Sequence, residues 1–243
     1  MIKSGNVAFI TGGTKGIGFG IAEALMEQGV NVVVTGRSLD QAVSAAEALN
    51  DKHQGQARAL GLGSDVRDME SQEDAVRAAV EEFGKVDYLI ANAGLGHFGS
   101  IEELASEQWH ATIDTNLTGV FYTLKAGLSQ LIANKGYFIT ISSLAGTNFF
   151  AGGAAYNASK FGLTGFTQAV MLDLRKHGVK ATTIMPGSVS TYFNDHQPDK
   201  DADAWKIQKE DIGEVVVDLL KMHPRVLPSK IEIRPTIPPS ARA

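Results

Sequence analysis

A tyrosine and a lysine stand four residues apart, at Tyr156 and Lys160, and Ser143 precedes the tyrosine by thirteen residues. On a helix, residues with this spacing share one face. A phenol has a pKa of about 10, so it is a poor proton donor near neutral pH unless a neighbouring cation stabilises its anion. We therefore predict that the ammonium of Lys160 lowers the pKa of Tyr156 toward the working range, and that Tyr156 acts as general acid and base.

Ser143 follows a short β-branched run from Tyr137 to Ile141, so we expect it at the carboxyl end of a strand, where open α/β sheets bind ligands. A hydroxyl there can donate a hydrogen bond to a substrate oxygen as negative charge develops on it. These groups together suit the reduction of a carbonyl. The alternative is a half-buried tyrosine and a solvated lysine on an amphipathic helix, which a Y-x-x-x-K motif on its own would favour.

A glycine-rich turn from Thr11 to Gly18 follows the first β-branched run and leads into an amphipathic stretch that ends near Gln28. Glycines allow close backbone approach, and a helix N-terminus directs free N–H groups at an anion such as a pyrophosphate. A P-loop is excluded because Phe19 stands where its lysine is required. A turn that only permits tight strand-to-helix packing is the alternative. The candidate phosphate-binding residues are Gly12, Thr14, Lys15, Gly16, Ile17 and Gly18.

The end of the second β-branched run, Asn31 to Thr35, bears on the choice between the two dinucleotides. An acidic residue there binds the ribose 2′-hydroxyl of NAD, whereas an arginine accommodates the 2′-phosphate of NADP. The chain has Arg37 at this point, with Lys15 in the turn nearby and no carboxylate before Asp40. Two cations at this point can bind the doubly charged 2′-phosphate, so NADP(H) is the predicted cofactor. The alternative is that both side chains are solvated surface residues with no ligand.

These residues need a framework to position them, and the chain alternates short β-branched runs with longer stretches that are apolar at helical spacing. That alternation predicts an α/β fold: a single Rossmann-type, doubly wound domain over residues 1–243, with about seven parallel strands and helices on both faces. The expected strands are 7–10, 31–35, 57–60, 86–91, 137–141, 181–185 and 231–233. The expected helices begin near Ile17, Leu39, Met69, Glu107, Ala154 and Asp211.

Two segments depart from this alternation. Residues 188–208 are polar yet contain Tyr192, Phe193 and Trp205, so we interpret them as a substrate flap or, alternatively, as a plain surface excursion. Residues 224–243 hold five of the seven prolines, which predicts an extended C-terminal tail that packs on another subunit or frays.

The composition argues against several classes of protein. A net charge of -5 without dense Lys/Arg clusters argues against nucleic-acid binding. No apolar run reaches the roughly 18 residues of a membrane span and no signal-peptide core is evident, so we expect a cytoplasmic protein that does not bind membranes. The absence of cysteine excludes thiolate catalysis, and the six histidines lack metal-ligand spacing, so no metal is expected.

Further motifs in register give the chain a resemblance to the short-chain dehydrogenase/reductase family over nearly its whole length. Beside the glycine-rich turn and the Y-x-x-x-K motif, the matching elements are Asp65-Val66, Asn92-Ala93-Gly94, Asn116, Ser143, Pro186-Gly187 and Thr191. The resemblance implies a catalytic set of Asn116, Ser143, Tyr156 and Lys160. It implies cofactor contacts by Asp65, Val66, Asn92, Ala93, Gly94, Tyr156, Lys160, Pro186, Gly187, Val189 and Thr191.

The resemblance also assigns roles. Asp65 and Val66 would contact the adenine ring, and residues 186–191 would meet the nicotinamide carboxamide. Asn116 would hold a helix kink and a water through which Lys160 relays protons, while Lys160 would also bond the nicotinamide ribose. A helix cap or bend is the alternative role for Asn116. Because family members are commonly built on their two long helices, we expect a homotetramer or a homodimer.

Three functional hypotheses follow. The first is NADPH-dependent reduction of a carbonyl compound to an alcohol, or the reverse oxidation. The second is a 3-oxoacyl-thioester reductase, although residues 231–235 lack the Asp-Gly-Gly of many acyl-carrier-protein ketoreductases. The third is a nucleotide-binding protein that has lost catalysis, which the intact serine, tyrosine and lysine argue against. The side chains expected around the substrate suit an apolar or aromatic carbonyl compound: Leu95, His97, Phe98, Leu144, Phe149, Phe150, Tyr192, Phe193 and Trp205.

Overall fold

The framework of the protein is one parallel sheet with the strand order β3-β2-β1-β4-β5-β6-β7, seen in a computed structural model that describes residues 2–55 and 57–238. The strands are β1 (Val7–Thr11), β2 (Asn31–Gly36), β3 (Ala59–Gly63), β4 (Tyr88–Ala91), β5 (Tyr137–Ile141), β6 (Lys180–Pro186) and β7 (Lys230–Ile233). Every neighbouring pair is parallel. The predicted seven-stranded parallel sheet is confirmed.

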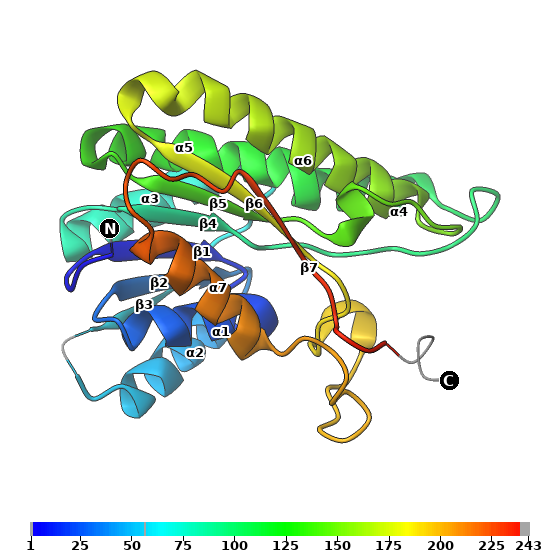
Figure 1. Cartoon of the computed structure of the whole chain (residues 1–243), viewed down its shortest axis with the longest axis horizontal. Coiled ribbons are helices and arrows are strands. Elements are labelled where there is room, and N and C mark those ends of the chain that lie inside the picture. The colour runs from blue at the N-terminus through cyan, green and yellow to red at the C-terminus, as the bar shows by residue number, and fades with distance from the viewer. Residues whose placement is uncertain (1, 56, 239–243) are drawn as a thin grey trace.

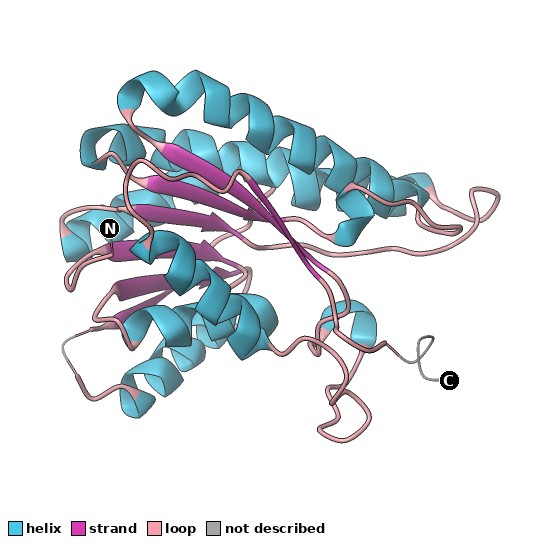
Figure 2. Ribbon diagram, viewed as in Figure 1, coloured by secondary structure: helices cyan, strands magenta, loops and turns pink. Residues whose placement is uncertain are grey.

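Helices cover both faces of this sheet (Figure 1), and Figure 2 shows the strands as a layer between them. The α-helices are α1 (Gly16–Met26), α2 (Leu39–Lys52), α3 (Met69–Phe83), α4 (Ser106–Ile113), α5 (Gly119–Asn134), α6 (Ala154–Leu174) and α7 (Lys209–Lys221). Helices α1, α2 and α7 share one apolar core with the sheet, and α3, α5 and α6 share the other. Because both faces are covered, β1 and β5 are buried at every residue, as their continuous apolar character requires.

The position of β1 defines the crevice in which a ligand can bind. This strand pairs with β2 on one side and with β4 on the other, so the direction of winding reverses beside it. In open α/β sheets, ligands bind outside the carboxyl ends of the strands at such a reversal. The glycine-rich turn after β1 and the Asn92-Ala93-Gly94 segment after β4 both lie at that edge.

Strand β3 departs from the prediction, because it covers Ala59–Gly63 rather than 57–60. The strand therefore continues through Gly61 and Gly63, beyond its expected end at residue 60. In the structure, a Cβ added to Gly61 would stand 2.1 Å from the carbonyl oxygen of Ala42, so α2 packs directly on the backbone of β3. Glycine here is required by the close approach of a helix and does not terminate the strand.

The helix expected from Glu107 is also different, because a π-helical turn at Asp114–Thr118 divides it into α4 and α5. Helices α1 and α7 begin slightly before their expected starts. Helix α7 begins at Lys209, two residues before the expected start, because Asp211 accepts a hydrogen bond from the backbone N–H of Gln208 and caps the helix.

The C-terminal segment from residue 224 joins the sheet in part. Its strand β7 pairs in parallel with β6, which confirms the strand expected at 231–233. The last five residues of the predicted tail, 239–243, lie outside the described part of the chain. Within the described residues, no helix is both long and apolar enough to cross a membrane.

Candidate active site

Tyr156 and Lys160 lie on the first turns of α6, and the structure confirms that they share one face. The Nζ atom of Lys160 lies 5.7 Å from the centroid of the Tyr156 ring. Lys160 is buried, and its ammonium donates a hydrogen bond of 3.0 Å to the carbonyl oxygen of Ile141, the last residue of β5. Burial lowers the pKa of Lys160 to about 8, because the charged form loses its hydration.

Burial has the largest effect on the pKa of the Tyr156 phenol in the structure. Burial raises the pKa of Tyr156 above its ordinary value, and a hydrogen bond with Ser143 opposes that rise. The expectation that Lys160 lowers this pKa therefore stays a prediction, and in the chain alone burial has the larger effect. The expectation left out burial, which depends on residues far from Tyr156 in the sequence.

Ser143 stands where the sequence placed it, just after the carboxyl end of β5. Its Oγ accepts a hydrogen bond of 3.1 Å from the backbone N–H of Ala145 and so caps a short 3₁₀ turn, Leu144–Gly146. The same hydroxyl interacts with the phenol of Tyr156 and opposes the rise in its pKa. Hence the hydroxyls of Ser143 and Tyr156 are neighbours at the crevice.

Asn116 is fully buried in the π-helical turn between α4 and α5. Its Oδ1 accepts a 2.9 Å hydrogen bond from the N–H of Leu95, and its Nδ2 donates to the carbonyl of Leu95 at 2.8 Å and to the Oγ of Ser159 at 3.0 Å. The side chain thus ties the helix break to the loop after β4 and to α6. A Cβ on Gly94 would lie 3.3 Å from Asn116 Oδ1 and 3.7 Å from Lys160 Nζ, which brings the three residues together.

The glycine-rich turn is held by the segment that follows β4. The Nδ2 of Asn92 donates hydrogen bonds of 2.9 Å to the carbonyls of Thr11 and Gly12. A Cβ on Gly18 would stand only 2.5 Å from that Nδ2 atom, and Gly12 adopts a positive φ of 63° that a side chain would strain. The glycines therefore allow the turn to pack closely on the segment after β4, and the start of α1 has no side-chain cap, so its first backbone N–H groups are available to an anion.

The two cations expected at a 2′-phosphate have different surroundings. Lys15 extends over the ring of Tyr192 in the flap, with Nζ 5.5 Å from the ring centroid. Arg37 is exposed after β2 and acts electrostatically on Asp65, whose pKa is lowered chiefly by a hydrogen bond from Arg67 and to a lesser degree by Arg37. Among the described residues, neither Lys15 nor Arg37 is in an ion pair, so both cations remain available to an anionic ligand.

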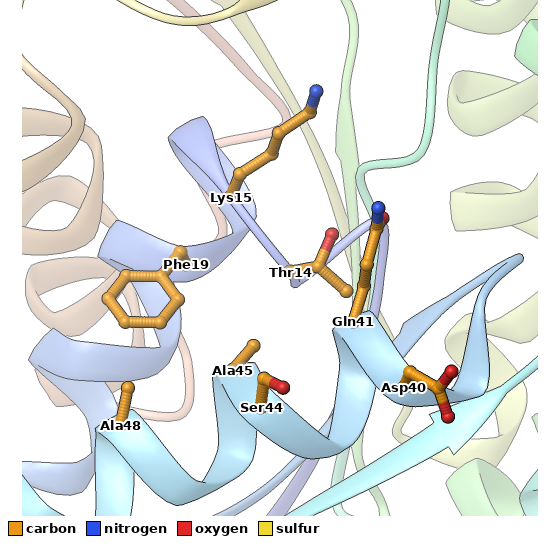
Figure 3. A pocket seen from close by; sticks show the side chains of 8 residues that line it. All are labelled: Thr14, Lys15, Phe19, Asp40, Gln41, Ser44, Ala45 and Ala48. Carbon is orange, nitrogen blue, oxygen red and sulfur yellow. The ribbon is translucent and has the colours of Figure 1, made fainter.

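Two cavities flank Lys15. The first, of about 480 Å³, lies between the start of α1 and helix α2 (Figure 3), where Phe19 faces the small side chains of α2 and Lys15 extends away from them. The second, of about 410 Å³, lies between the glycine-rich turn and the flap. Thr14, Lys15 and Phe19 line both cavities, so the turn forms their common wall.

The segment after β6 returns to the glycine-rich turn. The N–H of Gly187 donates to the carbonyl of Ile233 at 2.8 Å, and Val189 forms a parallel bridge with Ile207. A Cβ built on Gly16 would lie 3.4 Å from the methyl group of Thr191, so this threonine stands beside the turn. Val66, the residue expected at the adenine ring, is buried against Gly119 at the start of α5.

A carboxylate inside the flap was missed by sequence reasoning. Asp203 is buried, and its oxygens accept from the hydroxyl of Ser190 at 2.8 Å, from His196 at 2.5 Å and from the ammonium of Lys206 at 2.6 Å. These contacts hold the pKa of Asp203 well below its usual range. The sequence offered only one weak signal, an Asp within a polar stretch.

The aromatic residues expected around the substrate divide into two groups. Phe98 and Phe193 contact the ring of Tyr156, and Phe150 contacts Phe98. Trp205 instead lies by Lys206, and Phe149 is 86% exposed. Within the described residues, no cluster of side chains could hold a metal ion.

The fold and these residues define a nucleotide-binding oxidoreductase of the α/β class, and comparison with known proteins identifies its family. Residues 6–202 match the family model for short chain dehydrogenases, so the chain belongs to that family. Its relatives include trans-4-hydroxycyclohexanecarboxylate dehydrogenase of Sinomonas cyclohexanicum, 39% identical over 76% of this chain and 73% of the relative. Another is a 3-oxoacyl-(acyl-carrier-protein) reductase of Vibrio cholerae, 36% identical over 79% and 76% of the two chains.

A solved structure agrees with this assignment. An alcohol dehydrogenase from the archaeon Thermococcus sibiricus, complexed with 5-hydroxy-NADP, superposes with a TM-score of 0.88 and 32% identity. The match covers 95% of this chain and 97% of that chain. The resemblance inferred from the sequence motifs is confirmed at the level of the family and the fold.

Proposed function

We propose that this chain reduces a carbonyl group to an alcohol with NADPH, or catalyses the reverse oxidation, with residues 1–243 acting as one cofactor-binding and catalytic domain. The observation that carries the proposal is the hydroxyl pair of Ser143 and Tyr156 beside the buried ammonium of Lys160, at the sheet edge that holds the glycine-rich turn. The relatives named for dehydrogenase and reductase activities support the same class of reaction.

The residues present fit a nicotinamide dinucleotide. Gly12, Gly16 and Gly18 shape a tight turn in which a side chain would clash with Asn92 or Ala93 or strain the backbone, and the start of α1 that follows has no side-chain cap. The pyrophosphate would bind there, the adenine beside Asp65 and Val66, and the nicotinamide near Thr191 and the loop that follows β6. When bound, the reduced nicotinamide supplies the hydride for the carbonyl carbon.

The protein residues would handle the proton. Tyr156 would donate its hydroxyl proton to the carbonyl oxygen, and Ser143 would donate a hydrogen bond to the same oxygen as charge develops on it. Lys160, held by Ile141, would stabilise the phenolate that remains. Asn116 would keep Leu95 and α6 in place around this group, which is a positioning role.

The choice of NADP over NAD would come from Lys15 and Arg37. Lys15 lines both cavities at the turn and Arg37 is exposed after β2, and an arginine can bind a phosphate through two parallel hydrogen bonds. The structural neighbour from Thermococcus sibiricus carries 5-hydroxy-NADP, which supports this preference.

A second candidate is a 3-oxoacyl-thioester reductase, favoured by the relative from Vibrio cholerae. The two candidates differ in the substrate, since a thioester reductase turns over an acyl thioester in preference to a free ketone. The test is a panel of free ketones, aldehydes and 3-oxoacyl thioesters, followed by the absorbance of NADPH. Turnover of thioesters alone would support the second candidate, and no turnover of any substrate would overturn both.

We also propose that the chain assembles as a homotetramer or homodimer through α5 and α6. Large apolar side chains on these helices are exposed, with Phe121 at 43%, Phe161 at 42% and Leu172 at 58%. Exposed apolar surface on a long helix pair favours association with a second copy. Light scattering coupled to size-exclusion chromatography tests this, and a monomer at micromolar concentration would contradict it.

A further inference from the structure

Three aromatic rings meet at the catalytic tyrosine, each from a different part of the chain. Phe98 comes from the loop after β4, Phe193 from the flap and Tyr156 from α6. The ring centroids lie 5.3 Å apart for Phe98 and Tyr156, 5.7 Å for Tyr156 and Phe193, and 6.3 Å for Phe98 and Phe193. These separations fall in the range in which aromatic rings attract one another in edge-on or tilted arrangements.

Gly96 makes room for this arrangement. A Cβ at residue 96 would stand 2.8 Å from the Cζ atoms of both Phe98 and Phe193, closer than real contacts allow. An alanine there would push the two rings away from each other or from Tyr156. The absence of a side chain at residue 96 is therefore part of what lets the two phenylalanines face the tyrosine.

The cluster is open to a ligand and nearly free of charge. Phe98 is 43% exposed and Phe193 is 36% exposed, so much of their apolar surface is accessible. The cation that lies against the Tyr156 ring, Lys160, is itself buried. Accessible apolar rings beside a proton donor favour a flat, uncharged apolar group on the substrate, because its burial there removes apolar surface from water.

We propose that the exposed faces of Phe98 and Phe193, whose rings meet over Gly96, form a ring-binding subsite, and that the substrate is an uncharged ketone or aldehyde with an aromatic ring next to its carbonyl. This inference rests on the proposed carbonyl reduction. The ring of the substrate packs on these exposed faces while its carbonyl oxygen faces Tyr156 and Ser143. Specificity then comes from two rings on segments that the folded chain brings together.

The experiment compares acetophenone with 2-butanone, which offers the same methyl ketone without a ring. For the wild-type protein we expect kcat/KM with NADPH to be at least about tenfold higher for acetophenone. Phe98→Leu and Phe193→Leu should each reduce this ratio roughly two- to tenfold, and Gly96→Ala should reduce it as well, with the affinity for NADPH retained. A wild-type ratio near one, or an equal loss for both ketones, would overturn the subsite.

Two variants serve as matched controls. Gly99→Ala adds the same methyl group in the same loop, where nothing lies within 4 Å of the added Cβ. Phe83→Leu removes a ring that packs under Arg58 at the end of α3, away from the cluster. Both should leave the ratio unchanged. A fall in the ratio in the controls as large as in the three test variants would also overturn the proposal.

Ligand binding separates this inference from the proposed function. Saturation-transfer NMR with acetophenone and the protein saturated with NADP reports ring contact without turnover. Signal in the wild type that falls in Phe98→Leu supports the subsite, even if neither ketone is reduced, in which case carbonyl reduction alone has failed. No ring signal, or a signal equal in both proteins, overturns the subsite whatever the turnover.

Discussion

The Nζ atom of Lys160 lies 3.0 Å from the carbonyl oxygen of Ile141, so an ammonium on α6 is fastened to the carboxyl end of β5. Both groups are buried, and the hydrogen bond fixes the lysine one helical turn beyond Tyr156. The cation is thus held by the sheet itself, at the strand end where Ser143 follows.

The burial of Lys160 makes the stability of the protein depend on pH. Its pKa is lowered to about 8 in the folded chain, so between pH 8 and the ordinary lysine value the unfolded chain binds more protons. The free energy of unfolding should therefore rise with pH across this window, by up to about 3 kcal/mol for this group. Urea unfolding at pH 8, 9 and 10 measures the rise, and Lys160→Met should abolish most of it; the same slope in that variant would contradict the assignment.

Replacing Tyr156 with phenylalanine should remove the proton donor and leave the shape of the site intact. We expect Tyr156→Phe to lower kcat by at least about a hundredfold, in line with the contribution of general acid catalysis. NADPH binding, measured by fluorescence titration, should change little. A variant that turns over normally, or one that loses only cofactor affinity, would show that Tyr156 has another role.

Neutral residues at the two exposed cations should change the choice of cofactor. Lys15→Gln and Arg37→Gln should each weaken NADPH binding roughly tenfold and NADH binding far less, because only NADPH carries the 2′-phosphate. Dissociation constants for both dinucleotides, measured at one ionic strength, give the comparison. Equal weakening of the two would rule out contact with the 2′-phosphate.

The ordered structure of the flap should depend on the buried carboxylate of Asp203. Asp203→Asn removes the charge that binds His196 and Lys206, so trypsin should cleave the flap at Lys200 or Lys206 faster than in the wild type at pH 7. The pKa of Asp203 is lowered in the folded chain. The stability contributed by its ionised carboxylate is therefore present above the ordinary pKa of an aspartate, and it is lost only as the pH falls through the lowered pKa. The fluorescence of Trp205 in a Trp109→Phe background should therefore stay constant from pH 7 to 5.

A matched control exists within the same segment. Asp201 is exposed, and its side chain makes no hydrogen bond within the described residues. Asp201→Asn removes the same charge without touching the network around Asp203. Equal cleavage rates in the two variants would mean that net charge, and not the buried contacts, protects the flap.

The sequence predicted those features that depend on local spacing. The helical face of Tyr156 and Lys160, the glycine-rich turn and the strand before Ser143 were all placed correctly, because each rests on neighbours in the chain. Strand β3 was displaced because the reason for Gly61 is a helix elsewhere in the fold.

Other features depend on contacts between distant segments. The rise in the pKa of Tyr156 comes from burial at a site where the loop after β4 and the flap converge, and the network of Asp203 forms only once the flap has folded. The hydrophobic periodicity of the sequence does not predict either arrangement. The water relay through Asn116, the oligomeric state and the cytoplasmic location stay predictions.

A parallel bridge between Val189 and Ile207 closes the base of the flap. Backbone hydrogen bonds join Ser190 to Ile207 at 2.9 Å and Ile207 to Ser188 at 3.0 Å, so the chain enters and leaves the loop through one narrow neck. A compact loop whose two ends are close together keeps the same attachment to the sheet whatever residues occupy its tip. Residues added at its tip would then alter which molecules enter without disturbing the scaffold, which makes this loop a natural place to engineer a new selectivity.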